Sequence, residues 1–180
     1  MTIRRISLLI TIMALVSLLV SCSAAPTTTS QVDVVASASV VDNAAAFEKA
    51  ISKDGTWIIA TTKDLTIDKD LVLDGTFKNG KKDAEGNELY QRKIGLYTQD
   101  ADRNITARFT LTAKSLTIKS IQGSLEHGTF RGDLYVSAEN FKLIDATVDG
   151  NVYFLNDTVK SSFTMDETSK VTGVQEIKAG

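Results

Sequence analysis

The chain has 180 residues, of which 43% are hydrophobic and 23% charged, and its formal net charge is −2. Without an excess of basic residues it lacks the positive face that recruits nucleic acid or anionic lipid headgroups, so we exclude nucleic acid as a partner. Its single cysteine excludes a fold stapled by disulfides.

Residues 1–21 have the order of a targeting segment. Two arginines, Arg4 and Arg5, precede the uncharged run of residues 6–20, and small residues then lead to Cys22. The apolar run is shorter than the roughly 20 residues that a membrane-spanning helix needs, so we predict a cleaved signal peptide. Its removal takes Lys and Arg from 20 to 18 against 22 Asp and Glu, a formal charge of −4.

The cleavage region, Leu19-Val20-Ser21-Cys22, resembles the lipoprotein box of bacteria. In that family the cysteine thiol carries the lipid and the mature chain starts at this residue, which implies lipidation of Cys22. Acyl chains would then hold the protein at the extracytoplasmic face of the cell membrane, each buried methylene contributing about 0.8 kcal/mol. An ordinary secretory signal with a chance cysteine is the alternative.

The mature chain divides into a spacer and a folded domain. Residues 22–40 are rich in Ser, Thr, Ala and Val and contain the only proline, so we predict a flexible spacer. In the domain, residues 41–180, Asp42 or Asn43 is placed to cap a short amphipathic helix over residues 44–51. No second helix is predicted, because the rest of the chain has the short apolar runs and polar breaks typical of strands.

Two interleaved repeats run through the domain. The first alternates polar and apolar residues, starting at Asp64, Ser115, Asn140 and Ser162. The second surrounds the glycines Gly132, Gly150 and Gly173 with apolar residues. Strands that recur about every 20 residues indicate a chain that winds in rungs and stacks its strands in parallel. We therefore predict an all-β fold, a single-stranded parallel β-helix (β-solenoid) with a short N-terminal capping α-helix, in preference to a sandwich.

Side-chain parity in the second repeat predicts which residues face the core. Leu134 and Val136 share one parity with Phe130 and should point inward. Tyr135 and Tyr153 then point outward, one above the other. Stacked rings of this kind are a candidate ligand face for cell-wall polysaccharide, although such pairs also stabilise strands without a ligand.

Three resemblances accompany these patterns. Residues 55–59, Gly-Thr-Trp-Ile-Ile, resemble the N-terminal cap of pectate-lyase-like β-helices. Residues 132–136 and 150–154 are similar to the Gly-Asp/Asn-aliphatic rungs of bactofilins, which are polymer-forming bacterial scaffold proteins. Residues 55–59, 104–108 and 163–166 look like a group of uncharacterised lipoproteins of spore-forming Gram-positive bacteria. The last likeness spans most of the mature chain and implies no known activity.

No constellation of catalytic residues is visible, so we predict no catalysis and no cofactor. His127 is the only histidine, and we interpret it as a turn residue. A polysaccharide lyase is the enzymatic alternative, which the pectate-lyase likeness would imply. That likeness implies clustered acidic residues that hold calcium and an Arg or Lys as base, and Arg103, Arg108 and Arg131 are too few and too scattered to indicate such a site.

One stretch has the spacing of calcium ligands. Asp100, Asp102 and Asn104 are spaced as at the start of a calcium loop. Ile105 occupies the place of the required glycine and Leu111 that of the closing glutamate, so we reject an EF-hand. A weak calcium site and a solvated turn remain as alternatives.

Two polar stretches are predicted to leave the strands as loops. Residues 78–92 carry mixed charge, and residues 155–161 account for the extra length of the last repeat. A third polar feature, the tripeptide Arg131-Gly132-Asp133, is an adhesion ligand in some extracellular proteins. Since its glycine belongs to the repeat, we interpret the tripeptide as structural.

These patterns together favour a non-enzymatic, lipid-anchored envelope protein whose β-solenoid acts as a structural or interaction module. The expected partners are the membrane, through the lipid, and a cell-wall polysaccharide or an envelope protein. One alternative is a glycan-binding module that uses Tyr135 and Tyr153. Another is a bactofilin-like scaffold, against which the N-terminal helix argues because it covers an end that another rung would need.

Overall fold

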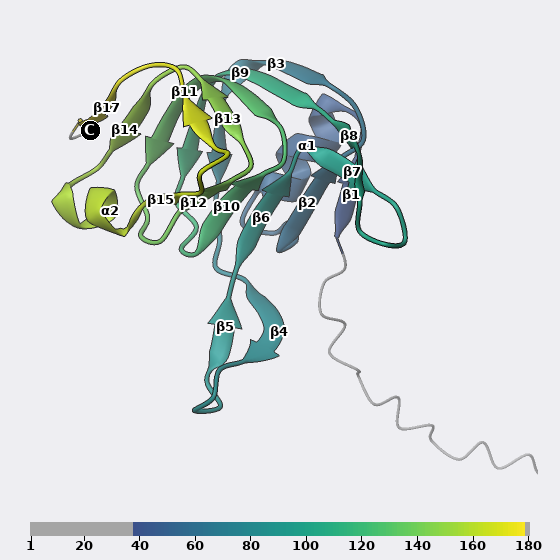
Figure 1. The fold of residues 1–180 in the computed structure, drawn as a ribbon, viewed down its shortest axis with the longest axis horizontal. Helices are drawn as coiled ribbons and strands as arrows, with labels where there is room; N and C mark the ends of the chain where they lie inside the picture. Colours follow the sequence, from purple (N-terminus) through teal and green to yellow (C-terminus); the bar gives the residue numbers. More distant parts are fainter. Residues whose placement is uncertain (1–37, 179–180) are drawn as a thin grey trace, which may run out of the picture. The chain divides into compact units, whose positions relative to one another are not determined.

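The computed structural model of the protein describes residues 38–178 (Figure 1). This part of the chain is mostly β, and its two larger sheets are parallel, as the repeats predict. Sheet A contains, in spatial order, β1 (Ser39–Val41), β2 (Ile58–Thr61), β6 (Arg92–Gly95), β10 (Gly123–Glu126), β12 (Lys142–Ile144) and β15 (Thr164–Met165). Sheet B contains β3 (Leu65–Leu73), β9 (Thr110–Ile118), β11 (Thr129–Val136), β13 (Thr147–Asp149), β14 (Val152–Phe154), β16 (Lys170–Val171) and β17 (Gln175–Ile177).

The chain alternates between the two sheets, and each new strand pairs with the strand of the same sheet from the preceding passage. In sheet B, β9 pairs with β3 and then β11 pairs with β9. The two halves of β11 pair with β13 and β14, which pair in turn with β16 and β17. Two antiparallel hairpins interrupt this alternation, β4 (Lys78–Lys82) with β5 (Glu88–Tyr90) and β7 (Tyr97–Gln99) with β8 (Ile105–Arg108).

The core lies between the sheets and consists of apolar side chains stacked strand upon strand. In sheet A one column is Ile59, Ile94, Leu125 and Leu143, and in sheet B one column is Leu73, Ile118, Val136 and Phe154. All eight side chains are buried, and burying each stabilises the fold by about 1.5–3 kcal/mol. Phe130, Leu134 and Val136 are buried as parity predicts.

Helix α1 (Ala44–Ile51) covers the first end of this core, as expected. Asn43 is the N-cap, and its side chain accepts a hydrogen bond from the backbone N–H of Ala46 at 2.9 Å. Phe47 and Ile51 are buried against the core. The first strand, β1, already begins at Ser39, so pairing in sheet A includes the last two residues of the expected spacer.

The repeated glycines mark a place where neighbouring backbones approach closely. A Cβ on Gly132 would lie 2.2 Å from the carbonyl oxygen of Ala113, and one on Gly150 would lie 2.1 Å from that of Gly132. Gly132 also has a φ of +142°, which residues with a Cβ rarely adopt. The glycine of the adhesion-like tripeptide is therefore required by the stacking of β9, β11 and β14.

The first repeat groups segments that lie in different sheets, so the stacking that it predicts between residues 115–120 and residues 140–145 is wrong. Ser115 pairs with Asp70 and Asp133 in sheet B, whereas Lys142 pairs with Ser124 in sheet A. Both sheets bury one face, and both therefore show the same alternation of polar and apolar residues. The alternation identifies the buried side of a strand but not the sheet to which the strand belongs.

Two loop predictions are also wrong. Residues 157–162 form helix α2 (Asp157–Ser162), capped by the Asn156 side chain, which accepts from the N–H of Val159 at 2.9 Å. The helix has six residues and buries only Val159, too little for an amphipathic pattern to reveal it. Residues 78–90 form the β4–β5 hairpin, which projects from the rest of the domain in Figure 1.

Candidate functional site

The outer face of sheet A carries two hollows, which together we call the furrow. The first has a volume of about 440 Å³ and lies between the β4–β5 hairpin and the sheet. The second, of about 410 Å³, lies over β1, β2 and β6 beside the β7 strand. Glu126 lines the first hollow and Lys93 lines the second, and an ion pair joins these two residues.

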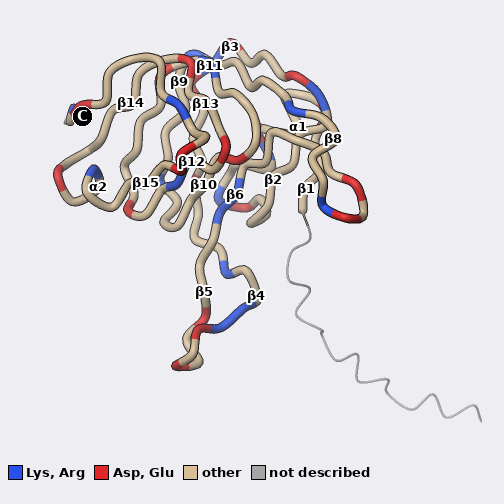
Figure 2. The backbone as a smooth tube through the Cα atoms, viewed as in Figure 1, with Lys and Arg blue, Asp and Glu red and all other residues tan. Residues whose placement is uncertain are grey.

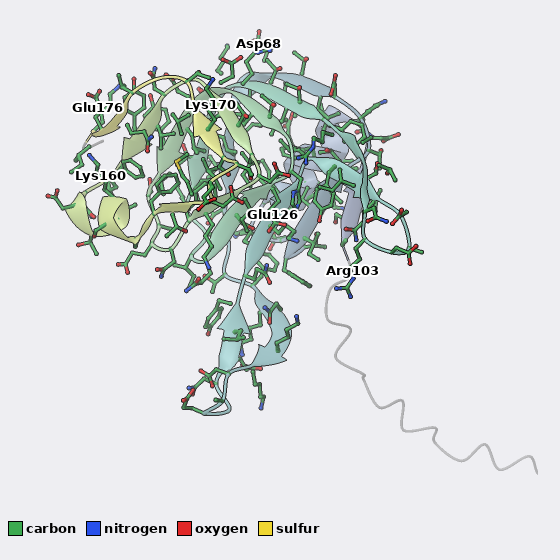
Figure 3. The ribbon with its side chains drawn as sticks, in the orientation of Figure 1. Asp68, Arg103, Glu126, Lys160, Lys170 and Glu176 are labelled. Atoms are coloured by element: carbon green, nitrogen blue, oxygen red, sulfur yellow. The ribbon has the colours of Figure 1, made fainter. Side chains whose placement is uncertain are left out.

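The floor of the furrow holds a buried carboxylate. Glu126 is 5% exposed, and its label lies over the middle of the sheet in Figure 3. One carboxylate oxygen is 2.6 Å from the ammonium of Lys93, and the other accepts a hydrogen bond from the Ser124 hydroxyl at 2.8 Å. An ionised carboxylate has about four acceptor positions, so these two contacts leave acceptor capacity for a ligand.

The hairpin wall of the first hollow combines an aromatic ring with amide groups. Tyr90 is 41% exposed and lines this hollow. Asn79 donates from its amide nitrogen to the side-chain oxygen of Gln91 at 3.0 Å, and both residues line the hollow with Gln122. A hydroxyl-rich ligand could exchange hydrogen bonds with the amides and stack on the ring.

The opposite side of the furrow is formed by residues that follow the strands of sheet A. The Tyr97 ring lies beside Gly95, where an added Cβ would be 3.0 Å from a ring carbon. The same ring meets His127 edge to face, with ring centroids 4.5 Å apart. His127 has a φ of +60° and occupies a turn, as predicted.

Asp145 links His127 of this turn to the guanidinium of Arg108. Its Oδ2 lies 3.0 Å from Nδ1 of His127 and 2.5 Å from Nη2 of Arg108. The hydrogen bond with His127, and to a smaller extent that with Arg108, lowers the pKa of the Asp145 carboxyl below its usual value. Arg108 is thus engaged in an ion pair, and Arg131 is likewise bonded to Asp149, at 2.9 Å.

The two tyrosines predicted as a ligand face do stack. The rings of Tyr135 and Tyr153 have centroids 5.0 Å apart and an interplanar angle of 33°. Lys178 was not anticipated: its ammonium lies 4.5 Å from the centroid of Tyr153 and 5.7 Å from that of Tyr135. A cation over the rings stabilises the pair without a ligand and occupies part of the surface that a sugar would need.

The calcium candidates bind one another. The backbone N–H of Asn104 donates to Asp100 at 2.8 Å, and its side-chain amide donates to the second carboxylate oxygen at 3.1 Å. The hydrogen bonds from Asn104 lower the pKa of Asp100. Asp102 is in the exposed turn. Within residues 38–178, no group of three or more His, Cys, Asp or Glu side chains is arranged to hold a metal ion. Cys22 lies outside the described residues.

The adhesion-like tripeptide is engaged inside the sheet. Arg131 is held by Asp149 of the neighbouring strand. Asp133 accepts hydrogen bonds from the backbone and the side-chain amide of Asn151, at 3.3 and 3.0 Å. Both charged side chains of the tripeptide therefore bind the next passage of the chain.

The residues of the furrow were not identified from the sequence. One signal was present in residues 123–126, Gly-Ser-Leu-Glu, because an inward Leu125 places Ser124 and Glu126 on the outer face. That parity could not reveal Lys93 as the partner of Glu126, since the two residues belong to different passages of the chain. Nor could it place Tyr90 beside them.

Figure 2 shows acidic and basic residues interspersed over the strands, hairpins and helices. No helix within residues 38–178 has the length and apolar character needed to cross a membrane. No protein-family model matches the chain, and neither the curated proteins nor the solved structures contain a significant match. The resemblances found in the sequence therefore remain predictions.

Proposed function

We propose that the protein is a lipid-anchored component of a bacterial cell envelope and that its domain is a β-solenoid that binds a ligand without catalysis. The alternation of the chain between two parallel sheets supports the solenoid, because each passage adds one strand or strand pair to each sheet. The segment ending at Cys22 supports the anchor. The furrow over sheet A is the observation that carries the binding function.

The chemistry of the furrow favours a glycan strand. Its polar groups include the acceptors of Glu126, the hydroxyl of Ser124 and the amides of the hairpin wall, all of which suit hydroxyl groups. Tyr90 offers an exposed ring for stacking against a sugar. Adjacent parallel β-strands lie about 4.8 Å apart, so an extended glycan chain that crosses sheet A would contact several β-strands in succession.

Binding to purified cell-wall polysaccharide tests this function. We expect the detergent-solubilised full chain to be retained and Tyr90→Ala to weaken retention about tenfold, which corresponds to about 1.4 kcal/mol. Tyr135→Ala is the matched control, because it removes the same ring from the lysine-covered pair. Equal retention of the wild-type chain and Tyr90→Ala would place binding outside the furrow. A loss confined to Tyr135→Ala would favour the tyrosine pair instead.

The anchor has a separate test. Cys22→Ala should abolish lipid labelling and move the protein from the membrane to the soluble fraction, because the acyl chains supply the attachment. A Cys22→Ala chain that stays in the membrane fraction to the wild-type extent would contradict this part of the proposal.

A further inference from the structure

The two ends of the sheets differ in how they are covered. At the first end, α1 buries Phe47 and Ile51 against the core. At the other end, β15, β16 and β17 each pair on one side only within residues 38–178. Figure 3 places Glu176 and Lys170 at this end, away from α1 in Figure 1.

Apolar side chains are exposed where these strands end the sheets. Ile177 is 41% exposed and Val174 is 51% exposed. Met165 and Val171, which continue inward columns of the core, are only partly buried. An unpaired edge that also exposes apolar side chains favours pairing with another strand.

The free backbone groups of β17 belong to Gln175 and Ile177. The carbonyl of Val174 accepts from Val152 and the N–H of Lys178 donates to Phe154, so residues 174 and 178 face β14. Successive residues of a strand direct their backbone groups to opposite sides, and Gln175 and Ile177 therefore face the open edge.

We propose that this edge pairs with β17 of a second copy in an antiparallel, two-fold symmetric contact centred on Ile177. In that register the two Ile177 residues form a hydrogen-bonded pair, and Glu176 of each chain lies opposite Lys178 of the other. Centring the contact on Glu176 would instead place two glutamates opposite each other. Cross-strand pairs gain from opposite charges and lose from like charges, so charge complementarity selects the first register.

The contact closes after two copies. Ile177 extends the buried column of Val136 and Phe154, so the partner's Ile177 continues the core across the two-fold axis. A two-fold contact uses the same edge of both chains, so β17 of each copy is fully paired once the dimer has formed. This dimer is independent of the furrow and differs from a filament, which would need both ends.

Disulfide formation tests the register in membranes that contain the full chain. Hydrogen-bonded antiparallel pairs have Cα atoms about 5.5 Å apart, within the range of a disulfide, so Ile177→Cys should give a covalent dimer on oxidation. Glu176→Cys is the matched control and should give little, because each cysteine then faces the partner's lysine. The wild-type chain reports any cross-linking through Cys22 itself.

Charge reversal tests the same contact without cysteines. We expect Glu176→Lys to weaken dimerisation about tenfold in sedimentation velocity, and the double variant Glu176→Lys, Lys178→Glu to restore it. Val40→Asp, at an exposed position of β1 at the first end, should have no effect. The proposal is overturned if the wild-type chain stays monomeric at its highest soluble concentration, if Glu176→Cys cross-links better than Ile177→Cys, or if the double variant fails to recover.

Discussion

Replacing Gly132 with alanine should destabilise the domain by about 2–4 kcal/mol. The new Cβ would lie 2.2 Å from the carbonyl oxygen of Ala113, nearly 1 Å closer than real Cβ contacts allow, and both atoms belong to paired backbones. Overpacking of this kind costs about 1–3 kcal/mol, and the positive φ of Gly132 adds about 1–2 kcal/mol for a residue with a Cβ. Alanine also lowers the conformational entropy of the unfolded chain, which stabilises the folded domain by only about 0.4–1 kcal/mol.

Two other glycines separate the contributions. Gly86 has a φ of +87° with no atom within 4 Å of its added Cβ, so Gly86→Ala measures the conformational cost alone. An added Cβ on Gly173 would lie 2.3 Å from the side chain of Asn151 and 2.6 Å from the carbonyl oxygen of Gly150, and Gly173 has no positive φ. Gly173→Ala therefore measures the free-energy cost of the close approach alone.

Urea unfolding followed by circular dichroism provides the measurement. With a slope of about 2 kcal/mol per molar urea, a loss of about 3 kcal/mol lowers the midpoint by about 1.5 M. We expect Gly132→Ala to be the most destabilised of the three variants and Gly86→Ala the least. If Gly132→Ala unfolds at the same urea concentration as Gly86→Ala, the close approach of the backbones is not the reason for glycine in the repeat.

Arg92 and Asp145 give two further predictions. Arg92 is buried, and its guanidinium donates at 2.8 Å to the carbonyls of Ala50 and Ser52 at the end of α1; burial lowers its pKa to about 10, which leaves it charged at neutral pH. Arg92→Met should lower the free energy of unfolding by about 2–4 kcal/mol, because it leaves these two carbonyls unpaired. A thermal midpoint equal to the wild-type value would show that removing the buried charge compensates for the lost hydrogen bonds. The lowered pKa of Asp145 means that its contribution to stability is complete above its ordinary value of 3.8 and is lost as the pH falls through its folded pKa. The thermal midpoint of Asp145→Asn should thus fall less than that of the wild-type chain between about pH 5 and about pH 3, and identical pH profiles would contradict the argument.

The strongest local patterns predicted much of the fold. Asn43 and the apolar face of residues 44–51 specify α1, because capping and amphipathic spacing act within a few residues. The glycine repeat predicted that Tyr135 stacks on Tyr153, since equal spacing in a parallel sheet places equivalent residues side by side. The first repeat, which alternates polar and apolar residues, failed because both sheets show the same alternation. It assigned Ser115 to the wrong neighbours.

The sequence by itself determined the capping helix and the side of β11 that is buried, because these depend on residues close together in the chain. Only the tertiary structure decided that Glu126 meets Lys93 and that Tyr90 stands beside them. It also decided that Lys178 covers the tyrosine pair. The physical reason is that these contacts join different passages of the chain, and no local preference of a residue encodes which passages become neighbours.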